Sequence, residues 1–396
     1  MINEKMRALG AKRSVIREIF EYGKKRKAEI GEENVFDFSL GNPSVPAPNE
    51  VNEGLIKLIK EESPVALHGY TSAQGDFAVR SAIADYINKT QGISVNADCL
   101  YMTVGAAAAL TCSLTALLCE GEEAIVLAPY FPEYKVFIER TGASVKEVLC
   151  HTDTFQPDIA AIEAAISEKT ACIIVNSPNN PTGAVFTEQS IIALTDLLKK
   201  KEKELGRTIY LISDEPYREL VYGDVKVPYL TKYYKDTLVC YSYSKSLSLP
   251  GERIGYVLVN PEISDFTSVY QAVAGAGRAL GFVCAPSMLQ KLIPLCLGKT
   301  SEIEIYDKNR TILLEKLTEY GYTVVKPDGA FYLFVKALED NASAFCERAK
   351  DYELLLVPSD DFGCGGFVRV SYCVKTEQIE KSLPAFRALA DSYKNC

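Results

Sequence analysis

The sequence has very little histidine and no closely spaced cysteine pair, and both absences narrow its possible chemistry. Only His68 and His151 occur among the 396 residues. Twelve cysteines are present, but no two form a C-x-x-C pair, so a Cys/His zinc site is not supported. Several cysteines, such as Cys172 and Cys240, lie in apolar runs and are expected to be buried thiols, not disulfides. We therefore expect no metal site, and we expect a reducing, cytoplasmic location.

The sequence also lacks an apolar run long enough to suit a membrane span. The most apolar stretch, residues 104–119, is short and contains Thr111, Ser113 and Thr115, so it is expected to be a buried helix. The N-terminus is partly basic but has no apolar signal-peptide core, and its glutamates argue against a transit peptide. With a formal net charge of -9, neither nucleic acid nor an anionic membrane is expected as a partner.

The length suggests two domains, and the larger one is expected to be of the α/β class. Short apolar runs, which predict strands, alternate with longer amphipathic stretches, which predict helices. The strand candidates are 124–127, 172–175, 209–212, 238–241 and 255–259, and the helix candidates include 133–141, 158–167 and 187–205. Such alternation predicts a mostly parallel sheet flanked by helices, with ligands beyond the carboxyl ends of the strands.

After about residue 286 the pattern changes to that of a smaller α+β domain. Helices are expected at 301–320, 342–351 and 376–393, with short strands at 322–325, 331–335, 354–357 and 367–371. We place the large domain at residues 50–285. The small domain is expected to combine residues 1–49 with residues 286–396.

The strongest chemical signal is a lysine directly after a predicted buried strand. Lys245 ends Ser242-Tyr243-Ser244-Lys245, and Arg253 follows in Pro250–Gly255. A partly desolvated lysine can form a Schiff base with an aldehyde and act as a base. Ser242, Ser244 and Arg253 carry hydroxyl and guanidinium groups that suit a phosphate. Taken alone, the motif would also fit an exposed lysine in a turn.

Three other polar segments also follow strand or helix boundaries. Asp214 could keep a pyridine nitrogen protonated, although it could equally cap a helix. Tyr217 could donate to a phenolic oxygen, and Asn180, in the rigid turn 176–183, could bind the same oxygen. The small residues Gly105, Ala106 and Ala107 open a helix whose free amides could hold a phosphate, although close helix packing explains them equally well.

Together these segments resemble the class I/II aminotransferases of fold type I. The matching pieces, in family order, are Gly41-Asn42-Pro43, Gly69-Tyr70-Thr71, Gly105-Ala106-Ala107, Pro129-Tyr130-Phe131-Pro132, Asn180-Pro181-Thr182-Gly183, Asp214-Glu215-Pro216-Tyr217, Ser242–Gly255 and Val368-Arg369-Val370-Ser371. They span positions 41 to 371. The resemblance implies a fold-type-I transferase that depends on pyridoxal 5'-phosphate.

The resemblance also implies a role for each matching residue. Lys245 would carry the cofactor, Asp214 would pair with its ring nitrogen, and Asn180 and Tyr217 would bind its phenolic oxygen. Phe131 would stack on the ring, although the adjacent Tyr130 is a second candidate. The phosphate ligands would be Gly105, Ala106, Ala107, Ser242, Ser244, Arg253 and a partner subunit's Tyr70. Arg369, helped by Asn180 and the Gly41 amide, would bind the substrate α-carboxylate.

The implied reaction moves an amino group from an L-amino acid to a 2-oxo acid by a ping-pong mechanism in a homodimer. Three alternatives are weighed against it. A carbon–sulfur β-lyase can use the same residues. A transcription regulator that senses the cofactor would need a DNA-binding module, for which 40 residues before Gly41 are too few. A non-catalytic relative would not be expected to fill every catalytic position.

The substrate pair is not encoded in these motifs, but Arg278 is one candidate determinant. It lies in the glycine-rich stretch 275–281, which suggests close backbone approach or a turn near the active site. In aspartate-type relatives an arginine at a similar distance after the lysine binds the distal carboxylate of the substrate. The surrounding residues match that motif poorly, so a surface or interface arginine is an equal alternative.

Overall fold

The computed structural model describes residues 1–11 and 14–394 and divides into two compact units. The larger unit comprises residues 45–303 and 328–330, and the smaller one comprises 1–44, 304–327 and 331–396. The change of sequence pattern predicts that residues 286–303 belong to the small domain. They group with the large unit because α12 (Ser287–Cys296) buries Leu289, Leu292 and Ile293 in the same apolar cluster as residues of α3 and α5.

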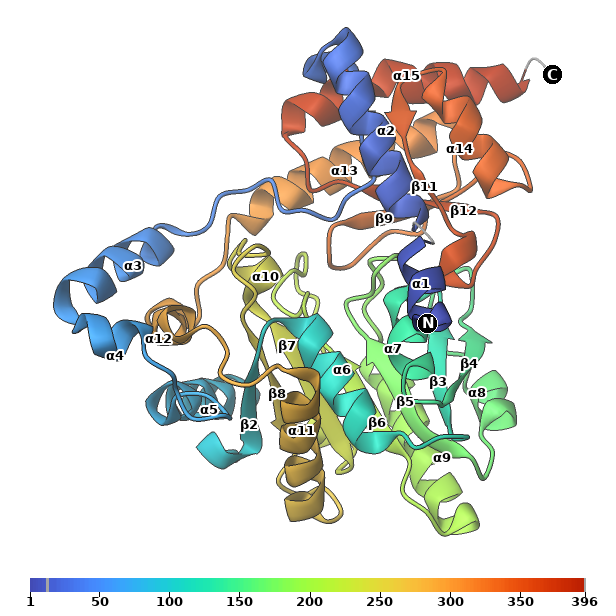
Figure 1. Ribbon diagram of the computed structural model, residues 1–396. Coiled ribbons are helices and arrows are strands. Elements are labelled where there is room, and N and C mark those ends of the chain that lie inside the picture. Colours follow the sequence, from blue (N-terminus) through green and yellow to red (C-terminus); the bar gives the residue numbers. More distant parts are fainter. Residues whose placement is uncertain (12–13, 395–396) are drawn as a thin grey trace. The chain divides into compact units, whose positions relative to one another are not determined.

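The large unit is built on one seven-stranded sheet (Figure 1). Its elements are α3 (Asn49–Glu61), α4 (Pro64–His68), α5 (Phe77–Gln91), β2 (Leu100–Thr103), α6 (Ala106–Leu117), β3 (Glu123–Ala128), α7 (Glu133–Glu139), β4 (Ser144–Leu149), α8 (Ile159–Ala165), β5 (Thr170–Asn176), α9 (Glu188–Leu205), β6 (Tyr210–Asp214), β7 (Thr237–Ser242), α10 (Tyr243–Ser246), β8 (Gly255–Val259), α11 (Phe266–Leu280) and α12. The strand order is β2-β8-β7-β6-β5-β3-β4, and only β8 runs antiparallel to its neighbours.

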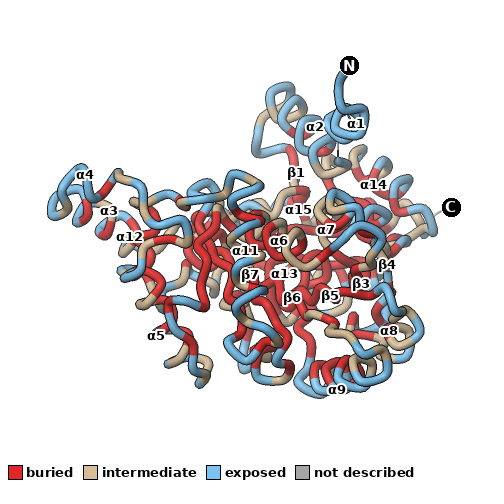
Figure 2. The backbone as a smooth tube through the Cα atoms, turned by 60° about the horizontal axis from the view of Figure 1, so that its bottom comes forward, coloured by how far each residue is buried: buried red, intermediate tan, exposed pale blue. Residues whose placement is uncertain are grey.

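Apolar residues cover both faces of this sheet, as expected for a mostly parallel sheet. Along β3, Ala124 and Val126 join a cluster with α6, α7 and α11, whereas Ile125 and Leu127 join a cluster with α8 and α9. Successive side chains of a strand point to opposite faces, so each strand feeds both clusters. Figure 2 shows the central strands buried and the outer turns of α8 and α9 exposed. The predicted α/β class is confirmed.

The helix predicted within the most apolar stretch is α6, whose residues Ala108–Leu110 and Cys112–Leu114 are buried. Within residues 1–11 and 14–394, the structure contains no helix with both the length and the apolarity that a bilayer crossing requires. The eleven described cysteines are free thiols, and Cys396 lies outside the described residues.

The small unit contains helices packed around short strands. Its elements are α1 (Glu4–Ala11), α2 (Val15–Ile30), β1 (Phe36–Asp37), α13 (Ile303–Tyr320), β9 (Tyr332–Lys336), α14 (Ala342–Lys350), β10 (Leu354–Leu355), β11 (Val357–Pro358), β12 (Phe367–Ser371) and α15 (Thr376–Lys394). β1 pairs with β10, and a second sheet has the order β11-β12-β9. The strand expected at 322–325 is reduced to an isolated bridge between Val324 and Val335.

Candidate active site

Six strands of the large unit end at one edge of the sheet, and five of these ends carry a predicted site segment. β2, β3, β4, β5, β6 and β7 point the same way because only β8 is reversed. Asn176 ends β5 and Asp214 ends β6, and these two residues are register partners. Ser242 ends β7 and pairs with Gly255, the first residue of β8. The topology therefore gathers residues that are distant in sequence at the edge where such sheets bind ligands.

Lys245 lies on α10, one short turn after the end of β7. Ser242 caps this turn, since its Oγ accepts from the Ser244 amide over 3.2 Å. The Oγ atoms of Ser242 and Ser244 are 2.7 Å apart, and both serines are buried. Lys245 is half-buried, in contrast to the fully exposed turn lysine that the motif alone would allow. The cap therefore fixes the backbone from which the lysine projects.

Asp214 is a buried carboxylate whose two oxygen atoms have different surroundings. Its Oδ2 accepts a hydrogen bond from the Tyr134 hydroxyl, whereas Oδ1, also buried, has no hydrogen-bond partner among the described residues. Burial raises the pKa of Asp214 to about 7, the Tyr134 bond opposes this rise, and the charge of Glu215 adds to it. A helix cap would bond to backbone amides, so the alternative role considered for Asp214 does not describe this side chain.

The turn that carries Asn180 is tied to β6 by Asn176. Nδ2 of Asn176 donates to the Asp214 carbonyl over 2.9 Å, and its Oδ1 accepts from the Asn180 amide over 2.8 Å. The far side of the turn is held by residues 328–330, whose Asp328 and Gly329 amides both donate to the Gly183 carbonyl. The role of this segment cannot be predicted from the sequence, because a hydrogen bond made by a remote backbone amide has no residue signature.

Gly105 and Arg253 lie against each other at the start of α6. Gly105 has a φ of 85°, and a Cβ there would lie 3.1 Å from Nη2 of Arg253. A Cβ at this position would make a tighter contact with the guanidinium than most Cβ atoms do, and the left-handed φ also favours glycine. Ala106 and Ala107 follow in the first turn of α6, where helix amides lack intrahelical partners. Positive charge and free amides thus occur together, as an anion site requires.

The aromatic candidates of this edge differ in exposure. Tyr217, in the turn at residues 216–219 that follows β6, is 5% exposed. Tyr130 is also buried in the core, whereas Phe131 keeps part of its surface accessible and meets Tyr134 edge-on at 5.8 Å. Of the two neighbours, Phe131 is the one with ring surface left to stack on a ligand. Tyr134 was not among the predicted site residues, because it occurs in an apolar helix pattern.

Arg369 and Gly41 belong to the small unit. Arg369 is 3% exposed on β12, the central strand of its sheet, so it is not the surface arginine of an edge strand. Its Nη2 donates to the Ser39 carbonyl over 2.6 Å, and its guanidinium lies 4.8 Å from the centre of the Tyr332 ring. The Tyr332 hydroxyl also occupies the space that a Cβ at Gly41 would need. Gly41 and Arg369 therefore share one neighbour, Tyr332.

Tyr70 and Arg278 are exposed on the large unit. Tyr70 is 99% exposed, and its loop is held by the Cys284 amide, which donates to the Ala73 carbonyl. Arg278 lies near the end of α11. The glycines around it have structural roles: a Cβ at Gly277 would collide with the Tyr101 hydroxyl, and Gly281 caps the helix with a φ of 77°.

Comparisons with known proteins identify the family. The family model described as aminotransferase class I and II matches residues 33–386. The chain belongs to the class I and II aminotransferase family. Like its relatives there, it is an enzyme that transfers amino groups.

The similar proteins cover nearly the whole chain. The aspartate aminotransferase of Thermotoga maritima is 30% identical over 93% of this chain and 95% of its own. A crystal structure of an aminotransferase from Eubacterium rectale is 57% identical, with a TM-score of 0.98 over 99% of both chains. The aspartate aminotransferase of Thermus thermophilus, solved with maleate, is 27% identical, with a TM-score of 0.86 over 98% of this chain and 100% of that one.

Proposed function

We propose that this aminotransferase depends on pyridoxal 5'-phosphate and that Lys245 carries the cofactor. One observation supports this above all others: the lysine and a buried carboxylate follow the adjacent parallel strands β7 and β6 at the same sheet edge. A carboxylate that is expensive to bury needs a partner for its charge. A protonated pyridine nitrogen is such a partner, and Oδ1 of Asp214 has no other among the described residues.

The other residues of this edge fit the same cofactor. The guanidinium of Arg253 lies against the backbone of Gly105, which directly precedes the first amides of α6, so a positive charge and free amides are available to an anion there. The phosphate would be held there by Arg253, Ser242, Ser244 and the amides of residues 105–107. Phe131 would cover one face of the ring, and Asn180 and Tyr217 would bind its phenolic oxygen. When bound, the cofactor supplies a ring that takes up the electron pair left on the substrate Cα.

The chain's own groups would direct the proton. Nζ of Lys245, released by the incoming amine, would take the proton from the substrate Cα and would then deliver it to the cofactor carbon to which the lysine had been joined. Asp214 would stay ionised and keep the ring nitrogen protonated. Arg369 would bind the substrate α-carboxylate, since its planar guanidinium suits two parallel hydrogen bonds. An amino acid and a 2-oxo acid would then use the enzyme in turn, which gives ping-pong kinetics.

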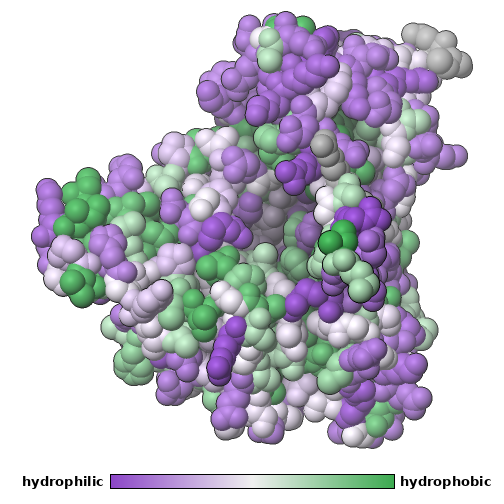
Figure 3. Space-filling view, viewed as in Figure 1, coloured by the Kyte–Doolittle hydropathy of each residue, from purple (hydrophilic) through white to green (hydrophobic). Residues whose placement is uncertain are grey.

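We further propose that the enzyme is a homodimer in which Tyr70 reaches the phosphate site of the partner subunit. Several apolar side chains are exposed near Tyr70 in the chain: Ile56 and Ile59 on α3, Val65 on α4, and Phe77 on α5. Figure 3 shows apolar surface gathered over α3 and α4, at the left of the view. Exposed apolar patches of this kind mark protein contacts, and a second copy of the chain is the proposed partner.

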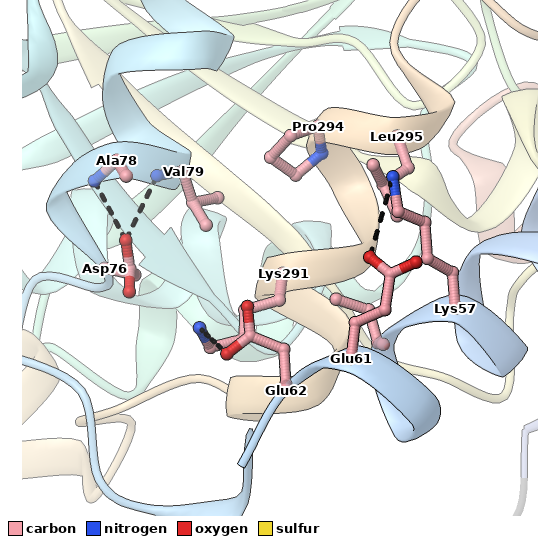
Figure 4. A pocket seen from close by; sticks show the side chains of 10 residues that line it. Lys57, Glu61, Glu62, Asp76, Ala78, Val79, Lys291, Pro294 and Leu295 are labelled. Atoms are coloured by element: carbon pink, nitrogen blue, oxygen red, sulfur yellow. Dashed lines mark hydrogen bonds and ion pairs between the residues drawn. The ribbon is translucent and has the colours of Figure 1, made fainter. Parts of the chain in front are cut away.

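A pocket of 410 Å³ lies in the same region, between α3, α5 and α12 (Figure 4). Four of its charged side chains form two ion pairs, since Lys291 lies 3.4 Å from Glu62 and Lys57 lies 4.0 Å from Glu61. A fifth, Asp76, accepts from two backbone amides at the start of α5. None of its lining residues is a predicted site residue. We therefore assign no substrate to this pocket and consider it part of the proposed subunit contact region.

A panel of amino acids tested against 2-oxoglutarate, followed by the absorbance of the bound cofactor, tests the function. Aspartate heads the panel because the Thermotoga and Thermus relatives are aspartate aminotransferases. A β-lyase would instead form its oxo acid from a cysteine-type substrate without any added 2-oxo acid. The free thiols of the chain suit a reducing compartment, and we propose a cytoplasmic location.

A further inference from the structure

The hydroxyl of Tyr134 is the hydrogen-bond donor that the structure gives to the Asp214 side chain. Tyr134 lies on α7 and is 1% exposed. Its ring stacks on Tyr130 at 6.3 Å with an interplanar angle of 13°, and Phe131 meets it edge-on. These contacts fix the ring plane, so the hydroxyl is held at Oδ2 of Asp214 and the other carboxylate oxygen is left for a ligand.

The other groups around Asp214 act against its negative charge. Burial is the largest effect that raises the pKa of Asp214, and the neighbouring Glu215 raises it further. Tyr217 on the same loop and the Cys240 thiol on β7 also face the Asp214–Tyr134 pair, and neither carries a positive charge. The Tyr134 bond lowers the pKa of Asp214. Burial raises the pKa of Tyr134 well above its ordinary value, so the hydroxyl keeps its proton and remains a donor.

We propose that Tyr134 is a positioning residue that keeps Asp214 ionised and directs Oδ1 toward the cofactor ring nitrogen. This inference rests on the proposed function, because it needs Asp214 to bind that nitrogen. The proton shared by the ring and the carboxylate stays on the ring only while the carboxylate is the weaker base. A hydrogen bond to Oδ2 makes it weaker. Without the hydroxyl, the proton moves toward Asp214 and the ring accepts electrons less readily.

The test is Tyr134→Phe, which removes one hydroxyl and keeps the ring. The readout is NMR of bound pyridoxal phosphate labelled isotopically at its ring nitrogen, because this signal reports the protonation of that nitrogen without turnover. We expect a protonated nitrogen in the wild type and a shift toward the unprotonated signal in Tyr134→Phe. Because Asp214 is then harder to ionise, its pairing with the ring nitrogen should weaken and the cofactor Kd should rise.

Tyr234→Phe is the matched control. Tyr234 is also buried in the large unit, and its hydroxyl donates to the Ile209 carbonyl over 2.7 Å. We expect this variant to lose comparable stability while its ring-nitrogen signal stays that of the wild type. If Tyr134→Phe fails to fold, p-aminophenylalanine incorporated at position 134 retains the shape with a weaker donor, and its signal should fall between the two states.

The outcomes separate this inference from the proposed function. If the wild type binds no pyridoxal phosphate, the proposed function itself is wrong. If the wild type binds it with a protonated ring nitrogen and the variant at position 134 gives the same signal and the same Kd, Tyr134 has only a packing role. Loss of the ring proton in the Tyr134 variant but not in Tyr234→Phe supports the positioning role.

Discussion

Gly105 and Arg253 approach so closely that a single added carbon at Gly105 would lie 3.1 Å from the guanidinium Nη2. We expect Gly105→Ala to displace Arg253 and to lower cofactor affinity. Gly121→Ala is the control, because Gly121 has the same φ of 85° with no atom near the added carbon. Both variants should lose about 1–2 kcal/mol of stability through the left-handed backbone. Only Gly105→Ala should raise the Kd for pyridoxal phosphate, and equal Kd values would remove this contact from the phosphate site.

Lys245 should be the residue that holds the cofactor covalently. Purified protein is expected to be yellow, and borohydride should fix the cofactor to a peptide that contains Lys245, identified by mass spectrometry. Lys245→Ala should retain cofactor binding but lose transamination, since the proton-transferring amine is gone. Lys232→Ala, at an exposed lysine of the same unit, should behave as the wild type. A fixed cofactor on any other lysine would disprove the assignment.

The carboxyl of Asp214 should make the cofactor-free enzyme less stable as the pH rises from about 4 to about 7. Its pKa is raised from 3.8 to about 7 in the folded chain, so the folded state holds this proton more tightly than the unfolded state. The resulting stabilisation is complete at low pH and is lost as the pH passes the folded pKa. The loss is at most about 4 kcal/mol.

This pH effect is isolated by comparing urea unfolding of wild type and Asp214→Asn. The difference in unfolding free energy between the two should change across this pH range, because asparagine does not titrate. Pyridoxal phosphate should reverse the trend in the wild type, as its ring nitrogen pairs with the ionised carboxylate. A difference that stays constant with pH would mean that Asp214 is already ionised in the folded chain.

Tyr70→Phe should weaken cofactor retention in the proposed dimer. One hydrogen bond to a charged acceptor is lost, at a cost of about 1.5–3 kcal/mol. Tyr22→Phe, at another exposed tyrosine, provides the control. Retention is measured by dialysis and the oligomeric state by light scattering. A monomer that is fully active under assay conditions would contradict the shared site.

Arg278→Ala should reduce kcat/KM for aspartate by roughly tenfold or more and leave alanine unaffected, if its guanidinium binds the distal carboxylate. Arg387→Ala, at an exposed arginine of the small unit, controls for the loss of charge. Equal losses for both substrates, or no loss, would leave Arg278 with a surface role. The glycines beside it no longer argue for a substrate site, since Gly277 and Gly281 serve helix packing and the helix end.

The sequence predicted the strands that carry the site better than the outer strands of the sheet. β5, β6 and β7 are continuous buried runs, and all three were found. The edge strands β4 and β2 were not among the predicted strands. β4 contains Lys146 at a half-buried position and Glu147 at an exposed one, so it has the polar character of an exposed segment. Continuous apolar runs therefore predicted the central strands of the sheet but not its two edge strands.

The order of motifs predicted the family and the ends of the strands, but not the contacts that orient the side chains. Tyr134 lies on α7, one turn past Phe131, in a helical pattern that also describes a core residue. Its link to Asp214 joins positions 80 residues apart and depends on how β3 and β6 are placed in the sheet. The role of residues 328–330 could not be predicted either, because their partners are also distant in sequence. Contacts between residues that are distant in sequence depend on the topology of the fold and cannot be predicted from the local composition.

Residues 328–330 determine when one part of the large unit can complete its backbone hydrogen bonds during synthesis. They are made after most of the large unit, yet their amides bond to Gly183 and Leu220, and Val221 bridges to Gly329. A chain leaving the ribosome can form the seven-stranded sheet once β8 has emerged. The loop at the end of β5 gains its last backbone partners only about 70 residues later, at a translation rate of about 5–20 residues per second. The loop that carries Asn180 is thus the last part of the large unit to complete its backbone hydrogen bonds during synthesis.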